Sequence, residues 1–426
     1  MVIEEPVALV GSACRFPGGV DTPSRLWDLS CAPRDLLTTI HPDRFSAEGY
    51  YRSDGQYHGH SNAKHAYLLS NDGMYRKFDA RFFNISSADA NVIDPQVRLA
   101  LEVVYEALES AGLTLEGLRG SDTAVYAGQM TNDYDRLMMR DADSIGTYHV
   151  TGTQRSMMPS RISHFFDWRG PSLSIDTACS SGLVAVHQAV QQLRTGQSRV
   201  AIVVAANLIL DPQYFISFSK LRMLSSHGRC RMWDISADGY GRGEGVVALV
   251  LKTISAVTVD GDGIECVIRE TGVGQDGWTP GLTTPNPLAQ ASLIRDCYAR
   301  AGLNLARMED RPQFFEAHGT GTQAGDPAEA EAISSVFSPS ADQSSSTACQ
   351  ALYVGSVKTV IGHSESASGL AAILRVSEAL QNAKIPPNFM FNRLNPKVKP
   401  FCAHLQVPTK VLAWPTGVGV RRASIN

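Results

Sequence analysis

Residues 175–183 read Ile-Asp-Thr-Ala-Cys-Ser-Ser-Gly-Leu, with the cysteine at position 179. Residues 171–175 predict a short strand before the cysteine, and residues 183–193 carry apolar side chains at helical spacing after it. Cys179 is therefore expected on a tight strand-to-helix turn, with its sulfur exposed above the positive end of the helix. That position favours the thiolate, so we expect a lowered pKa and a nucleophilic role for Cys179. A single cysteine is more often a small buried residue, so the other motifs must decide.

The start of this helix has an echo later in the chain. Residues 181–185 read Ser-Gly-Leu-Val-Ala, and residues 368–372 read Ser-Gly-Leu-Ala-Ala. Both copies follow a strand and a turn, and both continue as apolar helices, to Leu193 and Leu380. A repeat at this long offset predicts two similar α/β halves and not a solenoid of short repeats.

A histidine follows another predicted strand at residues 314–322, Phe-Phe-Glu-Ala-His-Gly-Thr-Gly-Thr. His318 is expected at the carboxyl end of that strand, where open α/β sheets bind their ligands. The next helix is predicted to begin with Asp326 as its N-cap, and Glu329 completes a capping box.

A second histidine repeats the pattern. Residues 353–363 form a predicted strand and a turn that ends at His363, and Glu365 follows closely. Either histidine alone is more often structural than catalytic. One cysteine and two histidines at glycine-rich strand-to-helix turns are harder to explain by packing, and neutral imidazoles can donate hydrogen bonds to a developing oxyanion. We therefore favour a catalytic role for Cys179, His318 and His363.

Other segments predict the elements around these motifs. Residues 7–10 predict a first strand, followed by a turn-rich loop over 11–19. Residues 42–83 have no sustained period and predict a long surface excursion. The clearest helix has Asp94 as N-cap and Pro95 at its first position.

Two low-complexity segments carry no site of their own. The glycine-rich run 239–245 is followed by a predicted strand and not by a helix, so it does not fit a dinucleotide-binding loop. The serine-rich run 338–350 predicts a solvated loop.

Composition limits the class of protein. Of the 426 residues, 43% are hydrophobic and 19% are charged, as in ordinary globular proteins. The net charge of −4 gives no electrostatic reason to expect a nucleic-acid or membrane partner. The longest apolar run, 200–210, is shorter than the ~20 residues that span a bilayer. The eight cysteines include no C-x-x-C pair, so neither zinc nor disulfides are indicated, and we expect a cytoplasmic protein with reduced thiols.

Three of these segments resemble the signature motifs of β-ketoacyl synthases, namely residues 176–181, 316–322 and 355–363. Further segments, 165–171, 225–234 and 272–277, resemble the ketosynthase domain of fungal iterative highly reducing polyketide synthases, some of which are fused to a peptide synthetase. The resemblance implies a thiolase-like fold, a duplicated five-layer αβαβα sandwich that forms homodimers. We expect an N-terminal half, 1–254, with the nucleophilic cysteine and a C-terminal half, 255–426, with the two histidines.

The resemblance also implies the reaction, a decarboxylative Claisen condensation in polyketide biosynthesis. Cys179 would accept an acyl chain from a phosphopantetheine thioester. His318 and His363 would then help a malonyl thioester lose carbon dioxide and stabilise the resulting enolate.

Supporting roles follow from the same resemblance. Lys358 and Glu365 correspond to a polar pair that orients the histidines, and Thr320 and Thr322 would contact the pantetheine arm. No metal or redox cofactor is implied. The implied partners are an acyl carrier protein, malonyl and acyl thioesters, and a second copy of the chain.

The end of the sequence departs from the family. Residues 421–426 resemble the start of the closing strand, but the Gly-Phe-Gly-Gly loop that follows it in the family is not in this sequence. That loop supplies a backbone N–H to the oxyanion hole, and loss of one such donor costs about 10²–10³ in rate. We therefore expect a C-terminally truncated ketosynthase with impaired or no condensation activity, or else a fragment of a multidomain synthase.

Two other classes of function stay open. One is a non-catalytic remnant that keeps only the fold, dimerisation or carrier binding, which the complete set of Cys179, His318, His363 and Lys358 opposes. The other is a Cys–His hydrolase or a degradative thiolase, which the Gly-Thr-Gly-Thr loop and the paired histidine turns oppose.

Overall fold

Two β-sheets organise the chain, which the computed structural model describes at residues 4–69, 73–338, 351–417 and 419–426. The first sheet has six strands in the order β5-β4-β6-β7-β1-β8. Their bounds are β1 (Val7–Arg15), β4 (Ala124–Gly128), β5 (Ser172–Ile175), β6 (Ala201–Asn207), β7 (Gly245–Thr253) and β8 (Cys266–Ile268). β4 is parallel to β5 and β6, whereas β7 is antiparallel to β6 and β1. β4 and β6 are buried along their whole length, because helices cover both faces of the sheet.

The second sheet is smaller and entirely parallel. Its order is β12-β10-β9-β14, with β9 (Phe314–Glu316), β10 (Leu352–Gly355), β12 (Leu405–Gln406) and β14 (Ala423–Ile425). Two short antiparallel pairs complete the described strands, β2 (Thr38–Thr39) with β3 (His65–Ala66) and β11 (Lys384–Ile385) with β13 (Leu412–Ala413).

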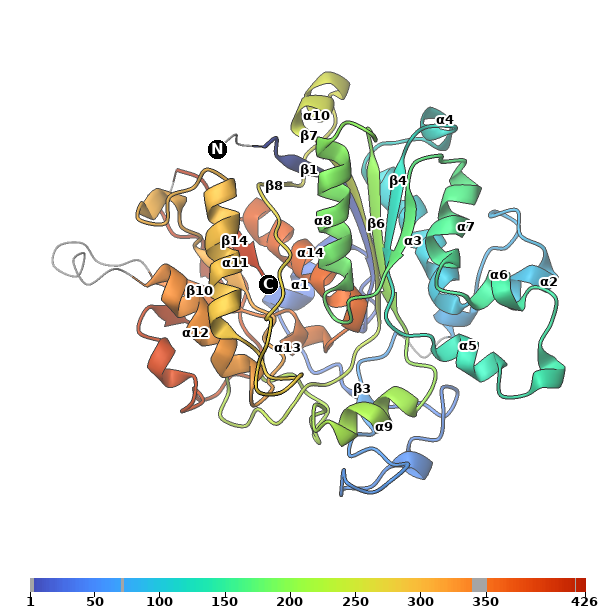
Figure 1. Ribbon diagram of the computed structural model, residues 1–426, viewed down its shortest axis with the longest axis horizontal. Coiled ribbons are helices and arrows are strands. Elements are labelled where there is room, and N and C mark those ends of the chain that lie inside the picture. Colours follow the sequence, from blue (N-terminus) through green and yellow to red (C-terminus); the bar gives the residue numbers. More distant parts are fainter. Residues whose placement is uncertain (1–3, 70–72, 339–350, 418) are drawn as a thin grey trace.

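Helices form three layers around the two sheets (Figure 1). α8 (Ser181–Arg194) and α14 (Ser368–Gln381) lie between the sheets and share one apolar core with β1, β4, β6 and β7. α3 (Pro95–Ser110) and α7 (Met157–Phe166) cover the outer face of the first sheet. α11 (Pro287–Arg300) and α12 (Gly325–Phe337) cover the outer face of the second. The result is the predicted five-layer αβαβα sandwich.

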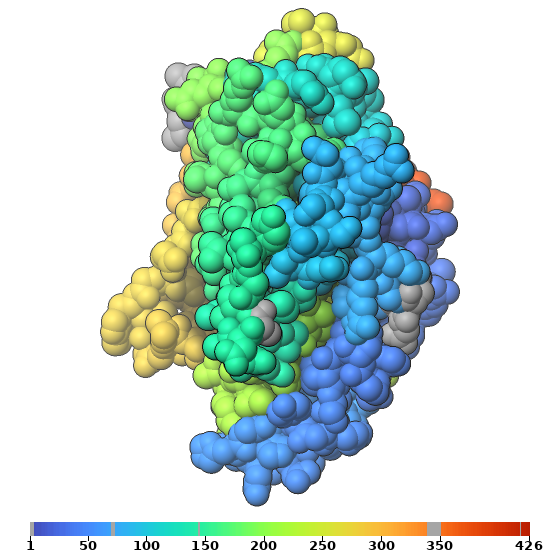
Figure 2. Space-filling view, turned by 90° about the vertical axis from the view of Figure 1, so that its right-hand side faces the viewer, coloured from blue at the N-terminus to red at the C-terminus, as the bar shows by residue number. Residues whose placement is uncertain are grey.

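Shorter helices connect these layers. They are α1 (Pro23–Cys31), α2 (Ser87–Ala90), α4 (Leu115–Leu118), α5 (Asp133–Met138), α6 (His149–Thr153), α9 (Gln213–Lys220), α10 (Ile254–Asp260) and α13 (Lys358–Ile361). Figure 2 shows the side of the molecule where segments of the first half of the chain, coloured blue to green, form the surface. The yellow segment between β8 and α11 projects from the body in this view.

α8 and α14, which both begin with the repeated Ser-Gly-Leu sequence, cross at their glycines. A Cβ on Gly182 would lie 2.6 Å from the carbonyl oxygen of Ser366 and 3.1 Å from the side chain of Leu370. A Cβ on Gly369 would lie 2.4 Å from the side chain of Leu183. Leu370, which follows Gly369, therefore packs on Gly182. In the same way, Leu183, which follows Gly182, packs on Gly369. This reciprocal contact explains the echo, because a duplicated helix pair needs the same small residue on both sides of the crossing.

The first strand is longer than the sequence predicts. β1 continues to Arg15, so the prediction of a loop at residues 11–15 is wrong. Gly11 looks like a strand breaker, but α3 crosses β1 there, and a Cβ would lie 2.5 Å from the carbonyl oxygen of Ala107. The register of β1 against β7 shifts between Leu9 and Gly11, which lets the strand pass under the helix.

Residues 42–83 form the predicted surface excursion only in part, because most of residues 48–60 are exposed whereas residues 61–69 are mostly buried. Arg44 forms a buried ion pair with Glu244, with 3.0 Å between nitrogen and oxygen, and Tyr67 is fully buried. Single buried charged and aromatic side chains attach this segment to the body of the protein. The segment has no periodic apolar face that could do so. Of the predicted loop 338–350, residues 339–350 lie outside the described residues.

The sequence predicts α3 correctly, since it begins at Pro95 and the side chain of Asp94 accepts a hydrogen bond from the N–H of Gln96. No helix in the described ranges combines the length and the apolar character needed to cross a bilayer. The seven cysteines within those ranges are free thiols.

Candidate active site

Cys179 lies on the tight turn that the sequence predicts, between β5 and α8. Ala178 takes a left-handed backbone conformation with φ of 57°, which is uncommon outside glycine. The hydroxyl of Ser181 holds the turn, because it accepts from the N–H of Thr177 at 2.9 Å and donates to the carbonyl of Ala178 at 2.6 Å. The turn leaves Cys179 half-buried two residues before the first turn of α8.

The predicted lowering of the Cys179 pKa is wrong. Burial raises the pKa of the thiol, the neighbouring carboxylate of Glu365 raises it further, and Lys358 only partly offsets the two. α8 begins two residues after Cys179, but the partial charge of a helix end is small beside the full charge of a carboxylate. Burial and the neighbouring carboxylate therefore favour the thiol form of Cys179.

Backbone hydrogen bonds hold His363 against the glycine-rich segment 239–245. The N–H of His363 donates to the carbonyl of Gly241, and the N–H of Gly243 donates to the carbonyl of His363, both at 2.8 Å. A Cβ at Gly241 would lie only 1.8 Å from the carbonyl oxygen of Gly228. These glycines allow close backbone packing, and β7 follows them, which confirms that the segment is no dinucleotide loop.

Hydrogen bonding determines the tautomer of His363. Its Nδ1 accepts the backbone N–H of Glu365 at 3.1 Å, so the neutral ring carries its proton on Nε2. Nε2 is buried and makes no hydrogen bond within the described residues, and it lies 4.0 Å from Oε2 of Glu365. Burial, and then the charge of Lys358, lower the pKa of His363 well below its ordinary value. His363 thus presents an unused N–H donor to the site.

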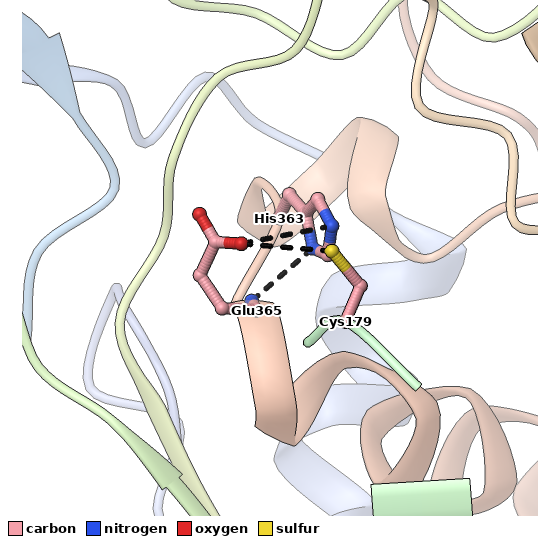
Figure 3. Close-up of side chains that lie close together, drawn as sticks. All are labelled: Cys179, His363 and Glu365. Carbon is pink, nitrogen blue, oxygen red and sulfur yellow. Dashed lines mark hydrogen bonds and ion pairs between the residues drawn. The ribbon is translucent and has the colours of Figure 1, made fainter. Parts of the chain in front are cut away.

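Glu365 joins the cysteine to a buried arginine. Its Oε1 accepts from Nε of Arg242 at 3.0 Å, and its Oε2 lies 3.7 Å from the sulfur of Cys179, which donates to it. Figure 3 shows Cys179, His363 and Glu365 facing one another. Both members of the Arg242–Glu365 ion pair are fully buried. Glu365 also holds a left-handed backbone, with φ of 45°, which persists only where its surroundings over-determine it.

Sequence reasoning missed Arg242. The only local signal is an arginine inside a run of glycines before a buried strand. Its partner Glu365 lies 123 positions away, so no spacing rule connects them.

The same three side chains have the chemistry of metal ligands. One ligand atom each from Cys179, His363 and Glu365 can be chosen so that all lie within 4.8 Å of one another. However, Nδ1 of His363 already accepts an N–H and Nε2 carries the proton, so the ring offers no free lone pair to a metal. The residues therefore do not fit a metal site.

His318 lies beside His363, with 5.5 Å between the ring centres and the rings nearly perpendicular. Its backbone N–H and that of Gly319 donate to the two oxygens of Glu329, at 2.6 and 2.9 Å. Burial, and then the charge of Lys358, lower the pKa of His318 to about 3. Both imidazoles are therefore neutral at physiological pH.

The predicted capping box at the start of α12 is wrong. The helix begins at Gly325, and the side chain of Ala324 cannot cap it. The carboxylate of Asp326 instead accepts from the N–H groups of Gly321 and Trp233, at 3.0 and 2.7 Å. Asp326 and Glu329 therefore hold the loop that carries His318, because a carboxylate can satisfy two loop N–H groups that no strand partner reaches.

Lys358 is the first residue of α13 and is almost fully buried. Burial lowers its pKa, while the carboxylates of Glu316 and Glu329 act in the opposite direction. Glu316 is held in turn by a buried ion pair with Arg375 of α14, at 2.7 Å. Arg375 is a charged residue in an apolar helix, and that is the sequence signal by which it could have been found.

The two predicted pantetheine contacts lie in the loop after His318. The hydroxyls of Thr320 and Thr322 are 3.3 Å apart. Thr320 is buried, and the hydroxyl of Thr322 accepts the N–H of Gly325 at 3.2 Å. The structure thus brings Cys179, His363, Glu365 and His318 together, with Lys358 behind them and the threonines on the adjoining loop.

Comparisons with known proteins match one family over most of the chain. The family model "Beta-ketoacyl synthase, N-terminal domain" matches residues 4–256, and "Beta-ketoacyl synthase, C-terminal domain" matches residues 265–392. The polyketide synthase-nonribosomal peptide synthetase TwmB of Talaromyces wortmannii is 58% identical over 99% of this chain. The highly reducing polyketide synthase calA of Penicillium decumbens is 55% identical over the whole of it. The chain spans only 14% and 15% of the length of these two relatives.

Solved structures extend the likeness to three dimensions. An oxazolomycin ketosynthase domain of Streptomyces albus, OzmH KS7, superposes with a TM-score of 0.90 at 32% identity, over 99% of this chain and 71% of that one. The ketosynthase from module 6 of the bacillaene synthase of Bacillus subtilis superposes with a TM-score of 0.87, also at 32% identity, over 99% and 69%.

Proposed function

The chain belongs to the β-ketoacyl synthase family and has its thiolase-like fold, and on that premise we propose that it catalyses a decarboxylative Claisen condensation in polyketide biosynthesis. The observation that carries the proposal is the unused Nε2–H donor of His363 beside the thiol of Cys179. A donor fixed in this way suits an oxygen that gains negative charge during the reaction.

In the first half-reaction, the sulfur of Cys179 attacks the carbonyl carbon of an acyl thioester. The new C–S bond forms, the tetrahedral intermediate collapses, and the phosphopantetheine thiol leaves with the proton that Cys179 gave up. The acyl chain is then held on Cys179 while the carrier exchanges.

In the second half-reaction, a malonyl thioester loses carbon dioxide. The electron pair of the broken C–C bond forms an enolate, and its oxygen accepts hydrogen bonds from His363 and His318. Both imidazoles are neutral donors, so they stabilise the enolate without protonating it. The enolate carbon then attacks the acyl group and releases the Cys179 thiolate, which solvent protonates.

Supporting residues and partners follow from the same proposal. Lys358 supplies positive charge behind the histidines, Glu365 fixes the His363 ring through its backbone N–H, and Thr320 and Thr322 line the approach of the pantetheine arm. The substrates are carried by an acyl carrier protein, and the domain binds no cofactor of its own. We place this chemistry in the cytoplasm, in keeping with the free thiols.

The two halves, 1–254 and 255–426, act as one catalytic unit in this proposal. Cys179 comes from the first half, and His318 and His363 come from the second. We also propose a homodimer. β5 pairs with β4 alone among the described strands, so its outer edge is open to a second copy.

Intact-protein mass spectrometry tests the function. The purified chain is incubated with an acyl-pantetheine thioester and then with malonyl-pantetheine, beside the Cys179→Ala variant. We expect an acyl adduct on the wild type only, and conversion of this adduct to a β-ketoacyl thioester when malonyl-pantetheine is added. An adduct that persists in the variant, or a stable adduct that malonyl-pantetheine does not discharge, contradicts it.

A further inference from the structure

We propose that Glu365 is the catalytic base that accepts the proton of Cys179 as the sulfur attacks, and that Arg242 is the positioning residue that holds this carboxylate. The inference deepens the proposed function, since it rests on Cys179 as the nucleophile. It assigns the first proton transfer to a carboxylate and not to either histidine.

The contacts of Glu365 carry the inference. Its Oε2 is the atom to which the Cys179 thiol donates, at 3.7 Å, which is within reach of a sulfur hydrogen bond. Its Oε1 is occupied by Arg242, so the carboxylate cannot turn away from the sulfur without breaking a fully buried ion pair. The thiol proton therefore already points at a lone pair that can receive it.

The histidines are unsuited to this step. Nδ1 of His363 accepts the N–H of Glu365, and Nε2 already carries a proton, so the ring has no free lone pair. Burial makes the imidazolium form of His318 costly, which disfavours this ring as the acceptor of the proton. Both rings remain available as donors for the later enolate.

Arg242 fits the role of a positioning residue. Its guanidinium is fully buried, and apart from the bond to Glu365 it faces aromatic rings of α9, with Phe215 4.9 Å from the guanidinium carbon. Nη1 and Nη2 have no hydrogen-bond partner among the described residues. Because the guanidinium of Arg242 has few other hydrogen bonds, its ion pair with Glu365 fixes its position. The same ion pair fixes the carboxylate of Glu365.

Other charged and titratable groups surround the pair. Those that act on Cys179, Glu365, Arg242 or His363 are Tyr240, Lys358, His318 and Asp133. Tyr240 donates to Glu365, and Lys358 favours the thiolate. A hydrogen bond joins the sulfur to Oε2 itself, so the proposed transfer is direct.

The step balances without any other reactant. The S–H bond of Cys179 breaks, the proton moves to Oε2 of Glu365, and the sulfur forms a bond to the acyl carbon. When the intermediate collapses, the departing pantetheine sulfur takes this proton back. Glu365 ends the step as the carboxylate it was at the start.

The test is the pH profile of Cys179 alkylation by iodoacetamide, followed by peptide mass spectrometry, which needs no condensation activity. If one proton is shared between the sulfur and Glu365, the reactive form has a constant population between the two macroscopic pKa values of the pair. We expect a flat wild-type rate from about pH 7 to 9. In Glu365→Gln, which cannot take the proton, the rate should rise about tenfold per pH unit. Glu365→Asp should restore the plateau at a lower rate.

Controls separate the base from charge and folding effects. Glu265→Gln removes a partly buried carboxylate that Ser12 donates to, outside the site, and should keep the plateau. The double variant Arg242→Met/Glu365→Gln removes both charges of the buried pair, so it should fold and show the tenfold slope. A wild-type rate that rises tenfold per unit, or a plateau that survives Glu365→Gln, overturns the proposal. If the alkylation rate shows the plateau but the thioester experiment gives no acyl adduct, Glu365 is the base of Cys179 and the proposed condensation is wrong.

Discussion

At the scale of single residues, the site separates the removal of a proton from the stabilisation of charge. Glu365 is an acceptor beside the thiol, whereas His363 is forced by a backbone N–H to be a donor. Burial keeps both imidazoles neutral, and the charge of Lys358 acts in the same direction. A protonated pair would bring two more positive charges beside Lys358, which the buried site could not solvate.

The neutral histidines predict an unusual pH dependence. Decarboxylation of malonyl-pantetheine should keep its rate within about twofold from pH 8 to 5.5, whereas a histidine of ordinary pKa would lose about tenfold by pH 5.5. The rate at which the wild-type protein releases carbon dioxide from malonyl-pantetheine, measured across this pH range, tests the prediction. An acid limb with a midpoint near 6.5 would contradict the prediction.

The same shift has a consequence for stability, with a definite sign. The folded-state pKa of His318 lies below the unfolded value, so below about pH 6.5 the unfolded chain binds protons that the folded chain does not. The free energy of unfolding should therefore fall as the pH drops from about 6.5 toward 3. Urea titrations across this range measure it.

A second residue-scale prediction concerns the buried pair Glu316–Arg375. Glu316→Gln leaves the guanidinium buried without its carboxylate, and we expect a loss of about 3 kcal/mol in the free energy of unfolding. Urea denaturation measures the loss. The control is Glu309→Gln, which breaks the exposed pair with Arg307 and should leave the midpoint unchanged. Equal midpoints for the two variants would be the contrary result.

At the scale of elements, the crossing of α8 and α14 sets the distance between the two halves of the site. Cys179 precedes α8, and Glu365 lies just before α14, in the short helix η6 (Glu365–Ala367). The reciprocal glycine contacts let the helices approach closely. The contact between the sulfur of Cys179 and the carboxylate of Glu365 therefore depends on Gly182 and Gly369, although neither glycine makes a hydrogen bond in the site.

Gly369→Ala tests this dependence. The added methyl would meet Leu183 at 2.4 Å, and we expect a loss of about 1–3 kcal/mol in stability together with slower alkylation of Cys179. Gly263→Ala is the control, because a Cβ there meets nothing within 4 Å. Denaturant midpoints and alkylation rates are measured on both variants. A Gly369→Ala protein as stable and as reactive as the wild type would show that the crossing can relax without moving the site.

At the scale of the whole molecule, the first sheet leaves an open edge close to the active site. β5 is that edge, and it leads directly into the turn of Cys179. The side chain of Leu173 on this strand is 51% exposed. An open edge with apolar side chains suits a two-fold contact in which the same strand meets itself.

Leu173→Lys is therefore expected to convert the proposed homodimer to a monomer, because it would place two ammonium groups near the two-fold axis. Size-exclusion chromatography with light scattering measures the mass. Val259→Lys adds the same charge at a residue that is 78% exposed on α10, and should leave the dimer intact. A wild type that is monomeric at all concentrations would contradict the homodimer.

The local structural signals and the family were both predictable from the amino-acid sequence. The turn at Cys179, the cap of α3 and the echo of two helices were all readable, because short-range sterics and hydrogen bonds control them. The same holds for His318 and His363, which follow their strands directly. The resemblance in the signature motifs correctly identified the family and the five-layer fold.

The chemical behaviour of these groups depends on tertiary contacts that the sequence does not reveal. The raised pKa of Cys179 comes from burial and from Glu365, 186 positions away. Arg242 meets Glu365 across 123 positions, and Glu316 meets Arg375 across 59. Asp326 and Glu329 looked like helix caps and became supports for a loop, since the donors that they bind come from other segments. Burial and charge pairing depend on which distant segments pack together, and no local pattern in the sequence carries that information.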